Sequence, residues 1–373
     1  MDKSPRFQWK LILVPFSWLY GLVVWIRNFL YDNGLLKSTG FDLPVISVGN
    51  ITVGGTGKTP HTEYLAELLN KEFRVATLSR GYRRKSRDFR IATTRSTVLE
   101  IGDEPLQMKQ KFPDLIVAVD RDRVHGIREL MKLTPPVEVV LLDDAFQHRS
   151  LRPGYSILLI DYHRSILKDR LLPAGMLRES AANRNRAHLI LVTKTPVDIK
   201  PIEMREFANG LDPQIGQHLF FTTMSFGNLV PLFPGKAGYI RDVDWYREKE
   251  SGIILVSGVA NPHGLRAYAR SISKKTLELK FPDHHHYSLT DMEQITQKTA
   301  ELLKGYSEVL ILTTEKDAVK LRELDFPENI RGFMYAVPIR VEFLNADKEN
   351  FNKQIFGYVR SNKRGSILHQ GKV

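Results

Sequence analysis

Short apolar runs recur along the first half of the chain, separated by longer stretches with helical spacing. The run Leu43–Val48 is followed by Tyr64, Leu65, Leu68 and Leu69, which repeat at the three- and four-residue spacing of one helix face. A short apolar run between turn signals is typical of a strand buried on both faces of a parallel sheet. Similar runs occupy residues 75–79, 116–119, 137–142, 157–160 and 189–192. The alternation predicts an α/β fold with a doubly wound, mostly parallel sheet.

The same pattern divides the chain into domains. Residues 36–215 carry the alternating strands and helices of the first unit. Glycine and proline then punctuate short β-like runs over 216–245, which predicts a linker. Apolar runs at 252–257 and 309–313 predict a smaller C-terminal α/β domain over 246–373.

The segment 1–35 is hydrophobic and rich in tryptophan. No charge lies between Lys10 and Arg27, a stretch that contains Trp18 and Trp25. As a helix this stretch would be about 24 Å long, shorter than the roughly 30 Å of a bilayer core. Tryptophan prefers the headgroup level, and flanking basic residues suit anionic lipid. We therefore expect residues 7–30 to form a helix that lies in or dips into the inner leaflet; the alternative is a helix packed on the protein's own core.

The amino-acid composition excludes some kinds of site and favours some kinds of partner. The 373 residues include no cysteine, which excludes a disulfide scaffold, a cysteine-ligated metal centre and thiol catalysis. The formal net charge of +12 favours polyanionic partners, such as nucleotides, nucleic acid or an anionic membrane surface.

A glycine-rich segment between the first predicted strand and helix has the context of a phosphate-binding loop. Its backbone N–H groups and the helix N-terminus would cradle phosphate oxygens. Lys58 would reach the β- and γ-phosphates, and the Thr59 hydroxyl would bind Mg²⁺. The strict Walker pattern begins with glycine where this sequence has Thr52, so the loop is a variant. The expected nucleotide-binding residues are Gly54, Gly55, Thr56, Gly57, Lys58 and Thr59.

Two acidic pairs are candidates for the chemistry. Asp143 and Asp144 end a predicted strand, where a carboxylate would hold Mg²⁺ beside the phosphate loop; the alternative is a solvated turn. Asp103 and Glu104 precede Pro105 at the start of a predicted helix. This second pair would be either a helix cap or the site of a catalytic base.

Charged clusters elsewhere allow more than one interpretation. The run His284–His286 suggests zinc, but three consecutive histidines cannot face one point, so we expect a histidine that orients a carboxylate. The basic stretch 79–90 follows a strand and suits phosphate recognition or a solvated face; it lacks the features of a nucleic-acid module. Arg178 and Glu179 follow a Pro/Gly turn and could form a surface salt bridge.

Taken in order, these motifs resemble the tetraacyldisaccharide 4′-kinase family, the lipid A 4′-kinases. Each motif is weak or moderate alone, but the ordered set is specific and runs from the hydrophobic N-terminus to about residue 321. Beyond it no motif is recognisable. The matching segments are 49–50, 53–60, 78–82, 102–105, 143–149, 172–179, 281–284 and 314–320.

The resemblance implies an ATP- and Mg²⁺-dependent kinase on the cytoplasmic face of the bacterial inner membrane. It would phosphorylate the 4′-hydroxyl of a lipid A precursor disaccharide, with no nucleic acid and no obligate protein partner. Asp103 would be the base and His284 its partner, with His285 as a rival. Asp143 and Asp144 would hold Mg²⁺. Arg178 and Glu179 would support the nucleotide site, and closure of the two domains would precede the reaction.

The main alternative is a P-loop NTPase switch or a metallochaperone-like GTPase. The segment Leu191–Asp198 is similar to a guanine-reading Asn-Lys-x-Asp loop, but Thr193 replaces the asparagine and Asp198 comes too late. A second alternative is a basic, nucleic-acid-binding ATPase. Lipid phosphorylation would separate the kinase from both.

Overall fold

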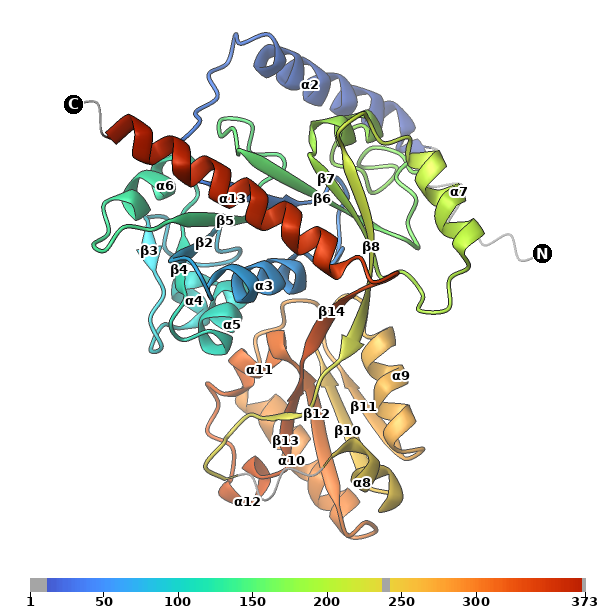
Figure 1. The fold of residues 1–373 in the computed structure, drawn as a ribbon. Helices are drawn as coiled ribbons and strands as arrows, with labels where there is room; N and C mark the ends of the chain where they lie inside the picture. Colours follow the sequence, from blue (N-terminus) through green and yellow to red (C-terminus); the bar gives the residue numbers. More distant parts are fainter. Residues whose placement is uncertain (1–11, 237–241, 371–373) are drawn as a thin grey trace.

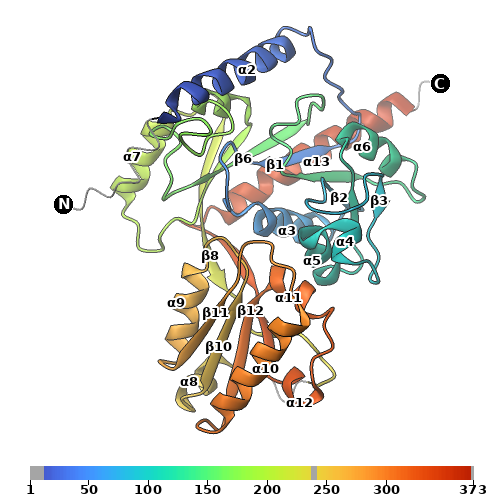
Figure 2. The same ribbon diagram turned by 180° about the vertical axis from the view of Figure 1, so that it is seen from behind.

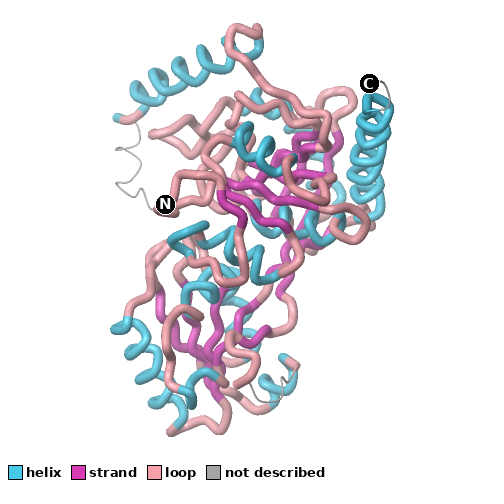
Figure 3. The backbone as a smooth tube through the Cα atoms, turned by 90° about the vertical axis from the view of Figure 1, so that its left-hand side faces the viewer, coloured by secondary structure: helices cyan, strands magenta, loops and turns pink. Residues whose placement is uncertain are grey.

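We describe the protein from a computed structural model, which describes residues 12–236 and 242–370. The chain forms two α/β domains that lie one above the other, as the views from the front, back and side agree (Figures 1, 2 and 3). A nine-stranded sheet builds the larger domain and a five-stranded sheet the smaller one. The predicted α/β class and mostly parallel sheets are therefore confirmed.

The large sheet has the order β14-β8-β7-β6-β1-β5-β2-β4-β3 and is parallel except at its edges. β1 lies in its middle, between β5 and β6. The edge strands β14 and β3 run antiparallel to their neighbours. The strands are β1 (Val45–Gly49), β2 (Val75–Ser79), β3 (Arg90–Ile91), β4 (Ile116–Val119), β5 (Val139–Asp143), β6 (Tyr155–Asp161), β7 (Leu189–Thr193), β8 (His218–Phe226) and β14 (Ile339–Phe343).

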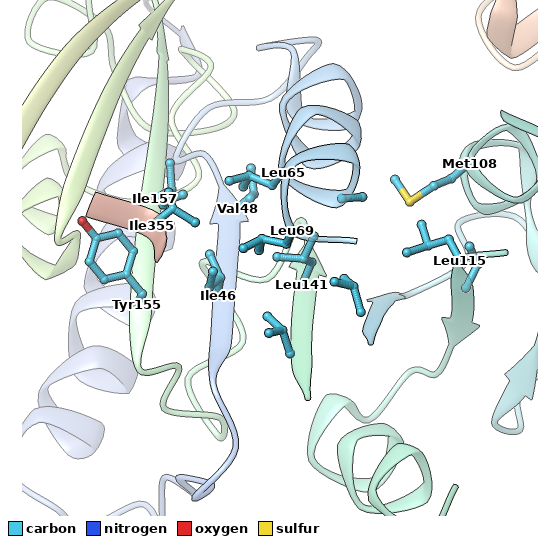
Figure 4. Packing of buried hydrophobic residues seen from close by; sticks show 14 of the residues in the cluster. Ile46, Val48, Leu65, Leu69, Met108, Leu115, Leu141, Tyr155, Ile157 and Ile355 are labelled. Carbon is cyan, nitrogen blue, oxygen red and sulfur yellow. The ribbon is translucent and has the colours of Figure 1, made fainter. Parts of the chain in front are cut away.

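Helices cover both faces of this sheet. Helix α3 packs against β1 and β5 through Leu65 and Leu69, which meet Ile46, Val48 and Leu141 (Figure 4). These are the helical-spacing residues and strand runs that the sequence predicts. The helices of the large domain are α2 (Val14–Asp32), α3 (Lys58–Leu69), α4 (Val98–Ile101), α5 (Asp103–Lys111), α6 (Arg123–Met131), α7 (Pro201–Leu211) and α13 (Lys348–Gln370), with a 3₁₀ turn at Ala181–Arg186.

The small sheet has the order β11-β10-β12-β13-β9, and only β9 runs antiparallel. Its core contains Ile254, Val256, Ile311 and Phe326. The strands are β9 (Val230–Pro231), β10 (Gly252–Ser257), β11 (Thr276–Lys280), β12 (Val309–Thr314) and β13 (Met334–Val337). The helices are α8 (Val243–Glu248), α9 (His263–Ile272), α10 (Leu289–Leu303), α11 (Glu315–Leu321) and α12 (Glu328–Arg331).

The domain boundaries differ from those expected. Residues 216–245 are not a linker: β8 belongs to the large sheet and β9 to the small one. The last part of the expected C-terminal domain also returns to the large domain, where β14 pairs with β8. Helix α13 then crosses the large sheet (Figure 1) and buries Phe351, Ile355 and Val359 in its core. These three side chains form an apolar stripe on α13, and its burial against the large sheet explains why the chain returns to the large domain.

Helix α2 lies along the end of the large domain far from the small one (Figures 1 and 2). It faces the protein with polar atoms: Ser17 Oγ donates to the Leu171 carbonyl, and Tyr20 Oη to the Arg178 carbonyl. Its apolar side chains point outward, so the helix is not packed on an apolar core. The exposed ones are Phe16, Trp18, Leu19, Leu22, Val23, Trp25, Ile26 and Phe29.

The expected helix over 7–30 thus begins at Val14 within the described chain, while residues 7–11 lie outside the described residues. Pro15 in the first turn is well placed there, because a first-turn residue needs no intrahelical N–H bond. None of the helices in residues 12–236 and 242–370 is long and apolar enough to cross a bilayer.

Candidate active site

The phosphate loop follows β1, as expected, and leads into α3. Gly54 and Gly57 have φ angles of 102° and 89°. Only glycine adopts these angles without strain. At Gly57 a side chain would also collide with Met224, whose Cε would lie 2.1 Å from an added Cβ. The sequence therefore places glycine where the backbone needs it to wrap around an anion.

Side chains at the end of the neighbouring strand β7 donate hydrogen bonds to carbonyl groups of the phosphate loop. The Thr193 hydroxyl donates to the Thr56 carbonyl at 2.8 Å, and the Lys194 ammonium donates to the Gly55 carbonyl. Lys194 also pairs with Asp161 at 2.8 Å. Thr193 and Lys194 belong to the segment that we compared with a guanine-reading loop. Their contacts show that both residues fix the phosphate loop.

His61, one turn into α3, is a second support that the sequence did not reveal. Its Nδ1 lies 2.7 Å from the Gly57 carbonyl and its Nε2 lies 3.0 Å from the Thr222 hydroxyl on β8. Burial lowers the pKa of His61 to about 4. The imidazole is therefore neutral when folded, and Nδ1 carries the proton that it donates to Gly57.

Because of this shift, acid should destabilise the fold through His61. Between pH about 6.5 and 4 the unfolded chain binds a proton at this site and the folded chain does not, so stability falls as pH drops. From pH 7 to pH 5 the loss from this residue should be roughly 2 kcal/mol. Urea unfolding of wild type and His61→Asn at both pH values measures it. Replacing the exposed His263 instead should leave the pH dependence unchanged, and an equal effect there would contradict the assignment.

Asp143 and Asp144 lie at the carboxyl end of β5, beside the loop. Lys58 Nζ is 3.7 Å from the Asp144 carboxylate, and Arg178 Nη1 is 3.2 Å from it. Asp143 is buried, and its Oδ1 has no hydrogen-bond partner among the described residues. Burial, followed by the nearby Glu104 carboxyl, raises the pKa of Asp143 to about 8.

An unpartnered buried carboxylate oxygen beside a second carboxylate is what a bound divalent cation would correct. Within the described chain no three acidic or histidine side chains cluster tightly enough to bind a metal alone. Mg²⁺ usually takes one or two carboxylates together with substrate phosphates and water. Asp143, Asp144 and the Thr59 hydroxyl, all oxygen donors, fit that role.

The second acidic pair lies at the start of α5. His284 Nδ1, from the small domain, lies 2.8 Å from Asp103 Oδ2. Burial would raise the pKa of Asp103, but the His284 hydrogen bond and the ammonium groups of Lys316 and Lys320 outweigh it and hold this pKa below the usual range. Asp103 is therefore an ionised carboxylate at neutral pH.

The Asp103–His284 contact answers two open points of the sequence interpretation. His285 is not the partner, because its Nε2 lies 2.9 Å from Asp291 Oδ2. The contact also already joins the two domains, so forming it needs no closing motion.

Glu104 lies between the Asp103 pair and the cluster formed by Lys58 and Asp144. Its carboxylate interacts electrostatically with Asp103, Lys58 and Asp144. The structure thus brings together the phosphate loop, the acidic pair after β5 and the acidic pair at α5. The positions at strand ends predict that the first two meet, whereas Asp103 and Glu104 were expected only at the start of a helix.

Arg178 and Glu179 are neighbours in the sequence, but their side chains lie in different places in the structure. The segment around Arg178 pairs with residues next to the phosphate loop, since Val53 N donates to Met176 O and Arg178 N to Ile51 O, each at 2.8 Å. Glu179, however, is turned towards α2 rather than towards the nucleotide site expected for it. Its Oε2 accepts hydrogen bonds from Asn28, Asn183 and Arg186. Glu179 therefore fastens α2 to the domain, because a buried carboxylate requires donors.

Comparison with known proteins agrees with this geometry. The profile of the family described as Tetraacyldisaccharide-1-P 4′-kinase (LpxK) matches residues 9–360. A tetraacyldisaccharide 4′-kinase of Phocaeicola vulgatus is 49% identical over 358 residues, covering 95% of this chain and 96% of the relative. One from Bacteroides thetaiotaomicron is 47% identical over 364 residues, covering 96% of this chain and 95% of the relative.

A solved structure is also similar. LpxK from Aquifex aeolicus, crystallised in complex with ATP, superposes with a TM-score of 0.71 at 32% identity, covering 94% of this chain and 99% of that one. The match spans both domains, and the GTPase and nucleic-acid alternatives gain no comparable support. The chain belongs to the tetraacyldisaccharide-1-phosphate 4′-kinase family.

Proposed function

We propose that this protein transfers the γ-phosphoryl group of ATP to the 4′-hydroxyl of a tetraacyldisaccharide 1-phosphate, with Asp103 as the base. The observation that carries the proposal is the Asp103 carboxylate, which lies 2.8 Å from His284 Nδ1 and next to a phosphate loop. Phosphoryl transfer asks a protein mainly for positioning and charge stabilisation. The site supplies both.

Each residue has a separate task in this mechanism. The loop from Gly54 to Thr59 wraps the phosphates with backbone N–H groups, and Lys58 places its ammonium against the β- and γ-phosphates. Thr59, Asp143 and Asp144 would hold Mg²⁺, which would neutralise charge at the phosphates. Arg178 is tethered by Asp144 and adds a second cation near the phosphates.

Asp103 acts on the acceptor. Its carboxylate takes the proton of the 4′-hydroxyl as that oxygen bonds to the γ-phosphorus, while the bond to the β-phosphate oxygen breaks and ADP leaves. The His284 hydrogen bond keeps the carboxylate oriented for this step. The products are ADP and the 4′-phosphorylated disaccharide.

Transfer of ³²P from labelled ATP to the detergent-solubilised disaccharide tests the function. We expect labelled lipid that requires Mg²⁺. Release of labelled phosphate without labelled lipid would instead support the NTPase switch, and the family relationship would then reflect ancestry only.

We further propose that α2 holds the enzyme on the anionic cytoplasmic face of the inner membrane as a peripheral or monotopic protein. The support is its arrangement, with polar atoms bonded to the protein and large apolar side chains facing outward. Contiguous exposed apolar surface of this kind marks an interaction site, and a lipid substrate must be met at a membrane.

Leu19→Glu should therefore weaken binding to phosphatidylethanolamine–phosphatidylglycerol vesicles. Leu19 is 62% exposed, and burying one leucine in lipid is worth about 2 kcal/mol, so we expect a loss of about 30-fold or more in partitioning. Leu289→Glu is the matched control, since Leu289 is 65% exposed but lies on the small domain. Vesicle sedimentation measures both variants. Equal binding by both would show that α2 does not face the lipid.

A further inference from the structure

The two lysines of the segment 314–320, Lys316 and Lys320, have so far received no role. This segment opens α11, with the Thr314 hydroxyl accepting a hydrogen bond from the Asp317 N–H. Lys316 and Lys320 are four residues apart, so they project from the same face of the helix. Helix α11 packs against α5 of the large domain, and this face is turned to Asp103.

Lys316 touches the partner of the base. Its Nζ lies 3.0 Å from His284 Nε2 and 3.4 Å from Asp283 Oδ1. It lies farther from Asp103, at 3.9 Å. The nearest polar atom to the Lys316 ammonium among these groups is therefore the second ring nitrogen of His284.

This contact determines where the imidazole carries its proton. A lysine ammonium has three donors and no acceptor, so His284 Nε2 must accept. The ring proton then resides on Nδ1, which donates it to Asp103 Oδ2 at 2.8 Å. A ring nitrogen that carries a proton has no lone pair to offer Lys316, so the contact selects the ring form with Nε2 unprotonated.

We propose that Lys316 is a positioning residue that fixes the tautomer of His284 and, through it, the orientation of the Asp103 carboxylate. The inference rests on the proposed role of Asp103 as the base. Asp103 Oδ1 accepts a hydrogen bond from the Glu104 N–H at 3.1 Å, so with His284 on Oδ2 both oxygens are held. The remaining lone pairs of the carboxylate then have fixed directions, as a base requires.

Lys320 differs from Lys316 in its partners. Its side chain is only 4% exposed, and its Nζ lies 3.3 Å from the buried Asp317 carboxylate and 3.1 Å from the His285 carbonyl. Lys320 is thus engaged within the small domain, 3.9 Å from Asp103. It adds positive charge near the base but does not bond His284.

Other charged groups around the dyad come from three further segments. Glu104 faces Lys316 from α5 at 4.0 Å, and Asp283 faces it from the loop before His284. Arg83 donates to the His284 carbonyl at 3.2 Å, and the Tyr82 ring lies 5.2 Å from the imidazole. Of these groups the Asp283 carboxylate comes nearest to a ring nitrogen, with Oδ2 3.9 Å from His284 Nε2, beyond hydrogen-bond distance. Lys316, at 3.0 Å from Nε2, is therefore the group that selects the tautomer.

Full-length Lys316→Met and Lys316→Arg proteins test the proposal. Lys298→Met is the control, because Lys298 is a half-buried lysine on α10 that pairs with Glu301. In the ¹⁵N spectrum of histidine-labelled wild type, the His284 signals, identified by their loss in His284→Gln, should show a protonated Nδ1 and an unprotonated Nε2. Lys316→Met should give mixed tautomers or a protonated ring, and Lys316→Arg and Lys298→Met should not.

Kinetics supply a second readout. Lys316→Met should lower kcat by about 10- to 100-fold with KM for ATP nearly unchanged, because the loss concerns orientation of the base. The acid limb of its kcat–pH profile should move to higher pH, since a cation that stabilises ionised Asp103 is gone. Lys316→Arg, which keeps charge and donor, should recover most of the activity.

Two results would overturn the proposal. One is a wild-type His284 protonated on Nε2, or a tautomer that is unchanged in Lys316→Met. The other is a parallel loss of kcat and ATP affinity with an unmoved acid limb, which would make Lys316 a phosphate ligand. If the tautomer changes as expected but wild type labels no lipid, the Lys316 assignment stands and the proposed function fails.

Discussion

Asp103→Asn should lower kcat for lipid phosphorylation by about 10³-fold and leave ATP affinity within about twofold of wild type. A general base acts on the acceptor hydroxyl in the transition state, where its removal typically costs 10²–10⁴-fold. The amide keeps the size of the side chain but cannot take a proton. Single-turnover labelling of the lipid, together with ATP binding by calorimetry, measures the two effects separately.

Asp114→Asn is a suitable control, because Asp114 is exposed on the loop that follows α5. This variant should be as active as wild type. If Asp103→Asn reduced ATP affinity as much as kcat, Asp103 would be a nucleotide or metal ligand rather than the base.

Lys58→Ala should reduce activity by on the order of 10³-fold or more and also weaken ATP binding. The ammonium stabilises the phosphates in the ground state and more strongly as charge shifts in the transition state. In this protein Lys58 also lies 3.7 Å from Asp144, so its removal takes a cation away from the acidic pair. Initial rates over a range of ATP concentrations separate the effect on kcat from that on KM.

Lys71→Ala, in the exposed segment just after α3, controls for loss of a positive charge in the same region. It should leave the rate unchanged. Activity of Lys58→Ala within a few fold of wild type would contradict the assignment of this segment as a phosphate-binding loop.

Much of the large domain could be predicted because its strands are buried on both faces. Runs such as Val45–Gly49 and Val139–Asp143 are almost uninterrupted in their apolar character, and polar residues begin where the strands end. Since parallel strands end at one edge, residues that follow them meet there. Lys58, Asp143 and Asp144 are therefore predicted from the sequence to lie together.

The route of the chain after the small domain could not be predicted in the same way. Phe351, Ile355 and Val359 do recur at helical spacing, but spacing identifies a helix without naming the sheet that it covers. The aromatic side chains of Phe220 on β8 and Phe343 on β14 pack against Phe351. The contact with Phe220 joins residues far apart in the sequence, which local patterns do not encode.

The supporting residues of the site were hidden for a related reason. His61 and Lys194 act through bonds to distant backbone groups, and nothing in their immediate neighbours marks these bonds. Glu179 was expected at the nucleotide site, but its bond to Asn28 of α2 could not be read from the sequence. The lysines of 314–320 did carry a signal, their four-residue spacing, but its meaning required knowing that α11 lies against α5.

The pairing of β14 with β8 has a consequence for how the molecule is assembled. Phe226 and Ile339 are directly opposite each other, so the chain leaves the large sheet and re-enters it at adjacent points. In topological terms the small domain is inserted between the two strands of a β-hairpin, β8 and β14. The two crossings form a two-stranded ribbon, which resists twisting more than a single covalent link would. The inserted small domain therefore brings His284 to Asp103 while held to its host at two places, the ribbon and the contact of α11 with α5.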